Sequence, residues 1–136
     1  MLFRSLKEIL AWTSGQPFLT QRLCNLIRNA TSIVPNHGEA QWVKHLVKTQ
    51  IVDNWEVQDE PEHLKTIRDR LLKSDRASDL LQLYHQILEH PVVAANSLVE
   101  RELILSGLIV EQQGLLQIQN RIYAAIFDRR WLDRYI

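Results

Sequence analysis

The fold is decided by the stretch Leu-Ile-Val-Glu-Gln-Gln-Gly-Leu-Leu-Gln-Ile-Gln, residues 108–119. Two apolar-rich runs of strand length flank Gln113-Gly114, and a glycine at this place favours a tight hairpin turn because it accepts a positive backbone φ. Outside this stretch, apolar residues recur mostly at the three- and four-residue spacing of amphipathic helices. The sequence therefore predicts a mainly α fold with one small β-hairpin.

Three helices are predicted before the hairpin. The first opens at Asp59-Glu60-Pro61-Glu62, since carboxylates and proline favour a first helical turn, and it carries an apolar stripe from Leu64 to Leu72. A turn and cap over Asp75–Ser78 precede the second helix, which ends at His90-Pro91. The third helix is short, from about Ser97 to about Leu105.

A single closing helix is predicted after the hairpin, with an apolar face that runs from Ile122 to Trp131. Helix, helix, short helix, two-stranded wing and final helix is the order of a winged-helix domain, and we assign this domain to residues 58–136. Its core is expected to bury seven side chains: Leu81, Tyr84, Ile87, Leu108, Ile118, Ile122 and Phe127.

The first part of the chain, residues 1–57, is predicted to be a helical subdomain. One amphipathic helix stops at Gly15, and a second opens at Pro17, where the missing N–H of proline leaves no helical hydrogen bond unmade. After a break over Pro35 to Gly38, a third helix is expected from about Glu39 to about Trp55.

Composition indicates an ordinary globular protein. The chain has 136 residues, and its 16 Lys and Arg balance its 16 Asp and Glu, which argues against a specialist in binding nucleic acids or membrane surfaces. No apolar run reaches the length of a spanning helix. Cys24 is the single cysteine, so no internal disulfide can form. These features predict a cytoplasmic protein.

Clusters of reactive side chains have simpler explanations than catalysis or metal binding. The histidines lack the helical pairing of a zinc-protease motif. Asp59, Glu60 and Glu62 are candidates for acid/base chemistry, but their place at a helix start favours interaction with the helix dipole. Cys24 and the four tryptophans lie in or beside apolar stripes, which favours packing over nucleophilic attack or base stacking. We expect no catalytic and no metal-binding residues.

A winged helix commonly binds DNA through its third helix and its wing, and the charges here oppose that use. Residues 97–103 carry two acids against one base, and the wing around Glu111 has no Lys or Arg to contact phosphate. Basic residues gather in the last helix instead, at Arg121, Arg129, Arg130 and Arg134. This distribution favours a solvated face or protein contact and makes nucleic acid an unlikely partner.

Residues 11–21 contain Gly15-Gln16-Pro17 at a helix start, and this Gly-x-Pro motif resembles that of STAND-class ATPases, signalling relatives of AAA+ proteins. Similarity to the AAA-like ATPase region of large bacterial multidomain proteins continues through Gln50–Trp55, Asp59–Leu64, Ile67–Leu71, Ser106–Val110 and Asn120–Tyr123. The resemblance covers nearly the whole chain. It implies the C-terminal part of such a module, a helical lid over residues 1–57 followed by the winged helix.

The resemblance also implies a function. Pro17, with Gly15, would contact the adenine of a nucleotide, and the region of Asn120 stands where some relatives sense it. The chain has no GxxxxGK[ST] loop, so it is expected to be no enzyme alone, with no cofactor in isolation and ATP or ADP only beside a cognate P-loop domain. The expected role is a regulatory module that packs on a P-loop ATPase domain or another protein. The alternative is a stand-alone winged-helix regulator that binds DNA or protein.

Overall fold

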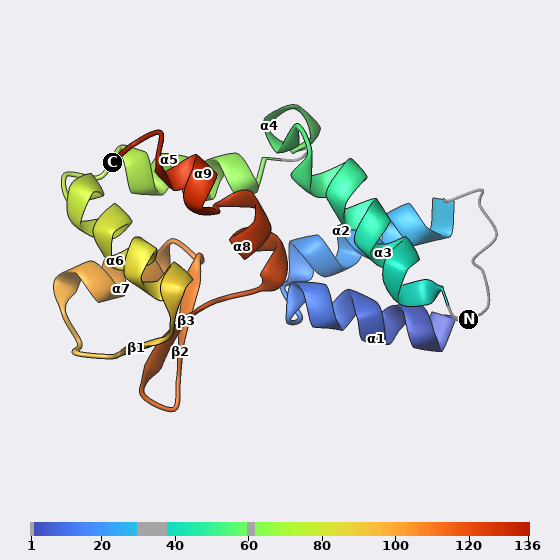
Figure 1. The fold of residues 1–136 in the computed structure, drawn as a ribbon, viewed down its shortest axis with the longest axis horizontal. Helices are drawn as coiled ribbons and strands as arrows, with labels where there is room; N and C mark the ends of the chain where they lie inside the picture. Colours follow the sequence, from blue (N-terminus) through green and yellow to red (C-terminus); the bar gives the residue numbers. More distant parts are fainter. Residues whose placement is uncertain (1, 30–37, 60–61) are drawn as a thin grey trace. The chain divides into compact units, whose positions relative to one another are not determined.

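The computed structural model describes residues 2–29, 38–59 and 62–136 (Figure 1). Three residues named above, Pro35, Glu60 and Pro61, lie outside these ranges, as does His37, one of the histidines. The chain divides into two compact units. Unit 1 comprises Met1–Glu60 with Asn120–Ile122, and unit 2 comprises Pro61–Gln119 with Tyr123–Ile136.

Unit 1 is helical in its described residues. Its elements are α1 (Leu2–Thr13), α2 (Pro17–Asn29), α3 (Glu39–Val47), the π-helix η1 (Lys48–Val52) and α4 (Trp55–Gln58). The single helix predicted from Glu39 to Trp55 is therefore wrong in its second half, where the helix first widens into a π turn and then breaks. The break lies at Asp53, which is extended (ψ 128°), and Asn54, whose left-handed backbone (φ 54°) cannot continue a right-handed helix.

The turn between α1 and α2 is held by side chains. Gly15 has a φ of +79°, and its N–H donates to Thr13 Oγ1 at 3.2 Å. The Gln16 side chain accepts from the N–H of Leu19 at 2.8 Å, which satisfies one of the free donors at the start of α2. Pro17 is the first residue of α2, as predicted.

Unit 2 combines helices with a small antiparallel sheet. Its elements are α5 (Leu64–Leu72), α6 (Ala77–Glu89), β1 (Val92–Val93), α7 (Leu98–Leu105), β2 (Ile109–Gln112), β3 (Leu115–Ile118) and α9 (Arg129–Leu132); α8 (Arg121–Ile126) starts in unit 1 and continues into unit 2. The sheet order is β1-β3-β2 (Figure 1). The hairpin is confirmed, with Ile109 opposite Ile118, and β1 is a strand that the sequence analysis does not predict. The protein is thus mainly helical with a three-stranded antiparallel sheet.

Helix α7 begins with a reciprocal capping box. The N–H of Glu100 donates to Ser97 Oγ at 3.2 Å, and the N–H of Ser97 donates to Glu100 Oε2 at 3.1 Å. Glu100 Oε1 also accepts from the N–H of Ala95 at 2.7 Å. The short third helix is confirmed because these bonds fix its first residue.

The closing helix is two helices rather than one. α8 ends at Ile126, and Asp128 caps α9 by accepting from the N–H of Trp131 at 2.9 Å. The carbonyl of Phe127, between the two helices, accepts a 2.6 Å hydrogen bond from the Tyr84 hydroxyl. The apolar stripe was correctly predicted, but the periodicity could not reveal that an aspartate interrupts it.

The predicted core is confirmed with two exceptions. Five of the seven side chains are buried and belong to unit 2: Leu81, Tyr84, Ile87, Leu108 and Phe127. Ile118 is only half-buried, and Ile122 is buried but belongs to unit 1. No helix in the described ranges is long and apolar enough to cross a membrane.

Candidate functional site

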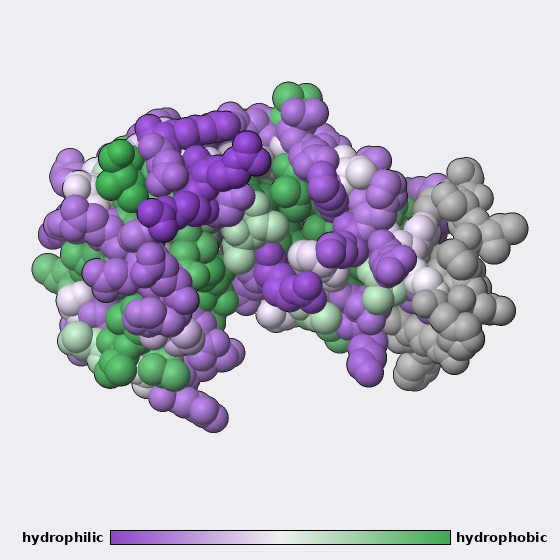
Figure 2. Space-filling model, viewed as in Figure 1, coloured by the Kyte–Doolittle hydropathy of each residue, from purple (hydrophilic) through white to green (hydrophobic). Residues whose placement is uncertain are grey.

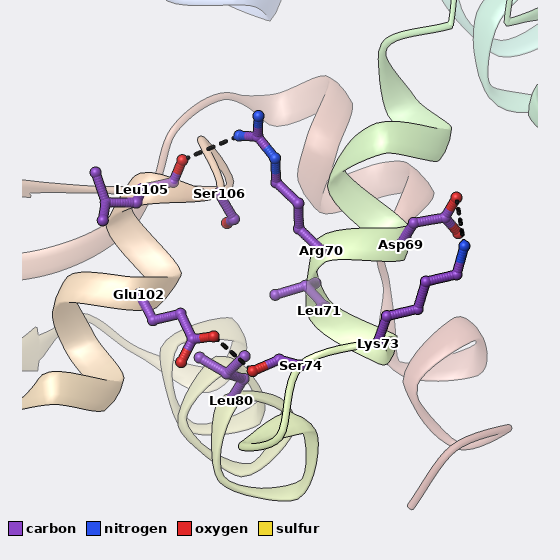
Figure 3. A pocket seen from close by; sticks show the side chains of 9 residues that line it. All are labelled: Asp69, Arg70, Leu71, Lys73, Ser74, Leu80, Glu102, Leu105 and Ser106. Carbon is purple, nitrogen blue, oxygen red and sulfur yellow. Dashed lines mark hydrogen bonds and ion pairs between the residues drawn. The ribbon is translucent and has the colours of Figure 1, made fainter.

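A pocket of about 600 Å³ opens on unit 2 (Figure 3). Its walls come from α5 and the turn that follows it, from α6, and from the end of α7. The lining residues are Asp69, Arg70, Leu71, Lys73, Ser74, Leu80, Glu102, Leu105 and Ser106. Elements far apart in the sequence therefore meet here.

The base of the pocket is apolar and its rim is partly so. Leu71 and Leu80 are buried, at 0% and 1% exposure, and form part of the lining. Leu105, the last residue of α7, is 77% exposed at the edge. An aliphatic side chain left this open next to a pocket can gain free energy by being covered.

A carboxylate lies across the pocket from the turn after α5. Glu102 Oε1 accepts from Ser74 Oγ at 2.5 Å, and Figure 3 shows the two side chains pointing toward one another. Glu102 Oε2 is buried and has no hydrogen bond in the described part of the chain. Arg76 Nη1 lies 3.5 Å from this oxygen, which makes an ion pair without hydrogen-bond geometry.

The two cations that line the pocket, Arg70 and Lys73, have partners other than Glu102. Arg70 Nη1 donates to the carbonyl of Leu105 at 3.2 Å, at the C-terminal end of α7 where carbonyls lack helical partners. Lys73 Nζ lies 3.8 Å from Asp69 Oδ2. A hydrogen bond from Arg68 and the positive charges of Arg68 and Lys73 lower the pKa of Asp69, although partial desolvation opposes them. Figure 3 places the Asp69–Lys73 pair away from Glu102.

The outer surface of α7 continues the pocket rim. Leu98 and Leu105 are seven residues apart, which puts them on one face of the helix, and they are 63% and 77% exposed. Arg101 and Glu102 lie between them on the same face by helical spacing. We call these four residues the α7 face. Figure 2 shows hydrophobic side chains at the surface over α7 among hydrophilic neighbours.

The arrangement offers aliphatic contact beside a fixed carboxylate. α7 packs on α6 and β2, so the α7 face is held on a rigid support. Its charges, one Arg and one Glu, cancel, which suits another protein better than the phosphates of a nucleic acid.

The residues singled out from the sequence lie elsewhere. Gly15 and Pro17 belong to unit 1, and the geometry of the α1–α2 turn explains both residue types. Cys24 is half-buried on α2. Trp55 and Trp131 are buried, and Trp12 carries the guanidinium of Arg121 at 4.0 Å from its ring centroid. Asn120 is buried at 4% exposure.

The explanation offered for the carboxylate cluster is wrong in part. α5 starts at Leu64 and has no acidic residue in its first turn. Asp59 is buried at the end of α4, and Glu62 lies before the helix, where it pairs with Lys65 at 3.9 Å. Among the residues that the structure describes, no group of three or more His, Cys, Asp or Glu side chains could hold a metal ion.

The pocket itself was missed by sequence reasoning. Ser74 and Glu102 are 28 residues apart, and each is unremarkable alone. One signal was present in the sequence. Leu98 and Leu105 lie seven residues apart on a short helix, and Leu103 already provides a side chain that this helix buries in the core. The charges of this helix argue against DNA contact, but charge alone does not indicate that Leu98 and Leu105 stay exposed.

Comparison with known proteins gives one informative relative. An uncharacterised WD repeat-containing protein of Synechocystis sp. is 42% identical over 135 residues, which cover 95% of this chain and 11% of that protein. The chain thus spans a small part of the relative's length. No protein-family model matches the chain, and no solved structure matches it.

This comparison corrects the family assignment. A relative that matches nearly the whole chain is a WD repeat-containing protein, so the resemblance to the C-terminal part of a STAND or AAA-like ATPase is wrong. The expected role as a regulatory module on a P-loop domain fails with it, and nothing favours the alternative of a DNA-binding regulator. The Gly-x-Pro motif misled because a glycine with positive φ followed by a helix-starting proline is a general turn device. The nucleotide role assigned to Gly15 and Pro17 loses its basis.

Proposed function

We propose that the chain is a non-catalytic protein-interaction domain and that the α7 face, with the adjoining pocket, is its contact surface. The observation that carries this proposal is the exposure of Leu98 and Leu105 on one side of a capped, well-supported helix. The buried centre of a protein interface is more apolar than its rim and is depleted of charged residues, so exposed aliphatic side chains suit such a centre.

The relative supports the same class of function. Its name places WD repeats in that protein, and WD repeats form β-propeller blades, a scaffold known for protein contacts. We infer that this chain serves a protein of that kind as a helical domain that recruits or positions a partner.

The domain type is a further part of the proposal. We propose that residues 58–136 form a winged-helix domain and residues 1–57 a separate helical subdomain. The order α6, β1, α7 and then the β2–β3 hairpin supports the winged helix, with α7 directly before the wing. In this domain the helix used by other winged helices for DNA would contact protein, because its outer face is apolar and neutral in charge.

The chain is also proposed to act without cofactor or catalysis. It has no phosphate-binding loop in its sequence, so we expect no release of phosphate from ATP by the purified chain. A saturable phosphate-release rate above that of buffer would contradict this part of the proposal.

Photo-crosslinking in cells can test the proposed interaction surface. A photoreactive amino acid replaces Leu98 in one strain and Glu111, on the wing, in another. Crosslinked proteins are identified by mass spectrometry, purified, and measured against the free chain by calorimetry. We expect a partner captured from position 98 and not from position 111.

Variants then tie the measured affinity to the surface. Leu98→Asp combined with Leu105→Asp should weaken partner binding by about 100-fold or more, as for loss of two central interface contacts. Val57→Asp is the matched control, since Val57 is 81% exposed but lies in unit 1. Unchanged affinity in a folded double variant would remove the α7 face from the interface.

A further inference from the structure

We propose that Glu102 is the recognition point for an arginine side chain of a partner segment, and that this guanidinium displaces Arg76 when the partner docks. The inference rests on the proposed protein-interaction function and adds the chemistry of the partner. The free chain already holds a guanidinium loosely at this carboxylate, which identifies the kind of group that fits.

The Glu102 carboxylate is fixed in orientation, but within the described residues only one of its two oxygens accepts a hydrogen bond. Ser74 Oγ donates to Oε1 at 2.5 Å and so fixes the orientation of the carboxylate. Oε2 is buried without a hydrogen bond in the described residues, although a carboxylate oxygen can accept two. An acceptor held in place with spare capacity is prepared for a charged donor.

Arg76 covers this oxygen without bonding to it. Its Nη1 lies 3.5 Å away, and its side chain is 49% exposed. Arg76 directly precedes α6, at the end of the turn from α5, so its side chain can swing into solvent without disturbing a helix. The ion pair is therefore one that a partner's guanidinium with better geometry can replace.

The surroundings match the rest of an arginine side chain. Leu105, 77% exposed, offers an aliphatic contact for the methylenes of the stem at the rim, and the buried Leu71 and Leu80 make the base of the pocket apolar. Arg70 does not compete, because it donates to the carbonyl of Leu105. Arginine fits better than lysine, since its planar fork is more weakly hydrated and can use both carboxylate oxygens.

The test uses the full chain labelled with ¹⁵N and titrated with capped hexapeptides followed by NMR. The probe is Gly-Leu-Ala-Arg-Ala-Gly, and its matched control replaces arginine with citrulline, which has the same shape and no charge. We expect roughly millimolar binding of the arginine peptide, with shifts at Ser74, Arg76 and Glu102, and about tenfold weaker binding of the citrulline peptide.

Three variants make the assignment specific. Glu102→Gln keeps an acceptor for Ser74 and should erase the preference for arginine over citrulline. Arg76→Ala removes the resident guanidinium and should strengthen arginine binding several-fold. Glu111→Gln is the control, because it removes the same charge from the wing and should change nothing.

The outcomes separate this inference from the proposed function. Equal binding of the two peptides, no binding of either, or an unchanged preference in Glu102→Gln would overturn the arginine site. If a crosslinked partner still needs Leu98 and Leu105 but ignores Glu102→Gln, the interaction surface stands and only the arginine assignment falls. Stronger binding of a lysine version of the peptide would also contradict the choice of arginine.

Discussion

Tyr84 connects the middle of α6 to the break between α8 and α9. Its ring is fully buried, and its hydroxyl donates to the carbonyl of Phe127 at 2.6 Å. Burial, together with the negative charge of Asp128, raises the pKa of the Tyr84 phenol above its ordinary value. The hydroxyl therefore stays protonated and remains a donor at any pH at which the protein is folded.

Tyr84→Phe should lower the free energy of unfolding by about 1 kcal/mol, the net worth of one hydrogen bond, because the ring still fills its space. Urea denaturation followed by circular dichroism measures the change. Tyr135→Phe is the control, since Tyr135 is 43% exposed near the end of the chain. Equal midpoints for the two variants would show that the Tyr84 bond adds no stability.

The sequence predicts whether a side chain is buried better than it predicts the hydrogen-bond partner of that side chain. Leu81 and Ile87 were placed in the core correctly, because they follow the helical period of α6. The partner of the Tyr84 hydroxyl lies 43 residues away, in the break between α8, which ends at Ile126, and α9, which Asp128 caps. Local periodicity contains no information on such a pairing.

At the scale of elements, the start of α7 depends on Ser97. Ser97→Ala removes the acceptor for the Glu100 N–H and should cost about 1 kcal/mol of stability, as for other helix caps. The matched control is Ser78→Ala in the first turn of α6, where the residue before the helix is Arg76 and Ser78 is exposed. Equal urea midpoints for Ser97→Ala and Ser78→Ala would contradict the capping role of Ser97.

The same capping box gives a pH dependence. Burial opposes ionisation of Glu100, yet hydrogen bonds from Ala95, Ser97 and Asn96 outweigh it and lower its pKa below 4.5 in the folded chain. A carboxyl group whose pKa is lower in the folded state than in the unfolded state stabilises the protein at pH values above its unfolded-state pKa. This stabilisation is lost as the pH falls through the folded-state pKa.

We therefore expect the stability difference between the unmodified chain and Glu100→Gln to be full at pH 7 and to shrink on acidification below about pH 4.5. Urea midpoints of both proteins across this range measure the difference. Glu111→Gln, exposed on the wing, should show no such trend. A constant difference for Glu100→Gln would mean that ionisation of Glu100 is not coupled to folding.

Whole elements were predictable where local chemistry fixes them. The hairpin follows from Gly114, which has a φ of +78°, between two apolar runs. The strand β1 has only two residues and exists because β3 pairs with it, so nothing in Val92-Val93 alone could indicate it. The π-helix η1 looks like ordinary helix in sequence because its apolar spacing is nearly the same.

For the whole molecule, Ile122 is the buried residue that α8 contributes to unit 1. Ile122→Ala should lower the free energy of unfolding by about 2 to 5 kcal/mol through lost apolar contact and a cavity. Thermal unfolding by circular dichroism measures the loss, with Ile136→Ala as a control because Ile136 is 65% exposed. A loss no larger than that of the control would mean that Ile122 is not a core residue.

The candidate site is formed by several elements that are distant in the sequence, and this is why it was not predicted. Its carboxylate comes from α7, its hydroxyl from the turn after α5, and part of its lining from α6. Only the packing of these helices brings Ser74 to Glu102. The exposed position of Leu105 was readable in principle from helical spacing, whereas the pocket beside it was not.

The return of residues 120–122 to unit 1 has a consequence for biosynthesis. When the ribosome has translated residues 1–60 of this chain, unit 1 still lacks Ile122 and the Arg121 guanidinium that lies 4.0 Å from the centre of the Trp12 ring. Those residues emerge only after all three strands of the sheet have been translated. Most of unit 1 is thus translated before unit 2 but can be completed only after the sheet of unit 2 has been translated, and during this interval its apolar helices lack part of their packing.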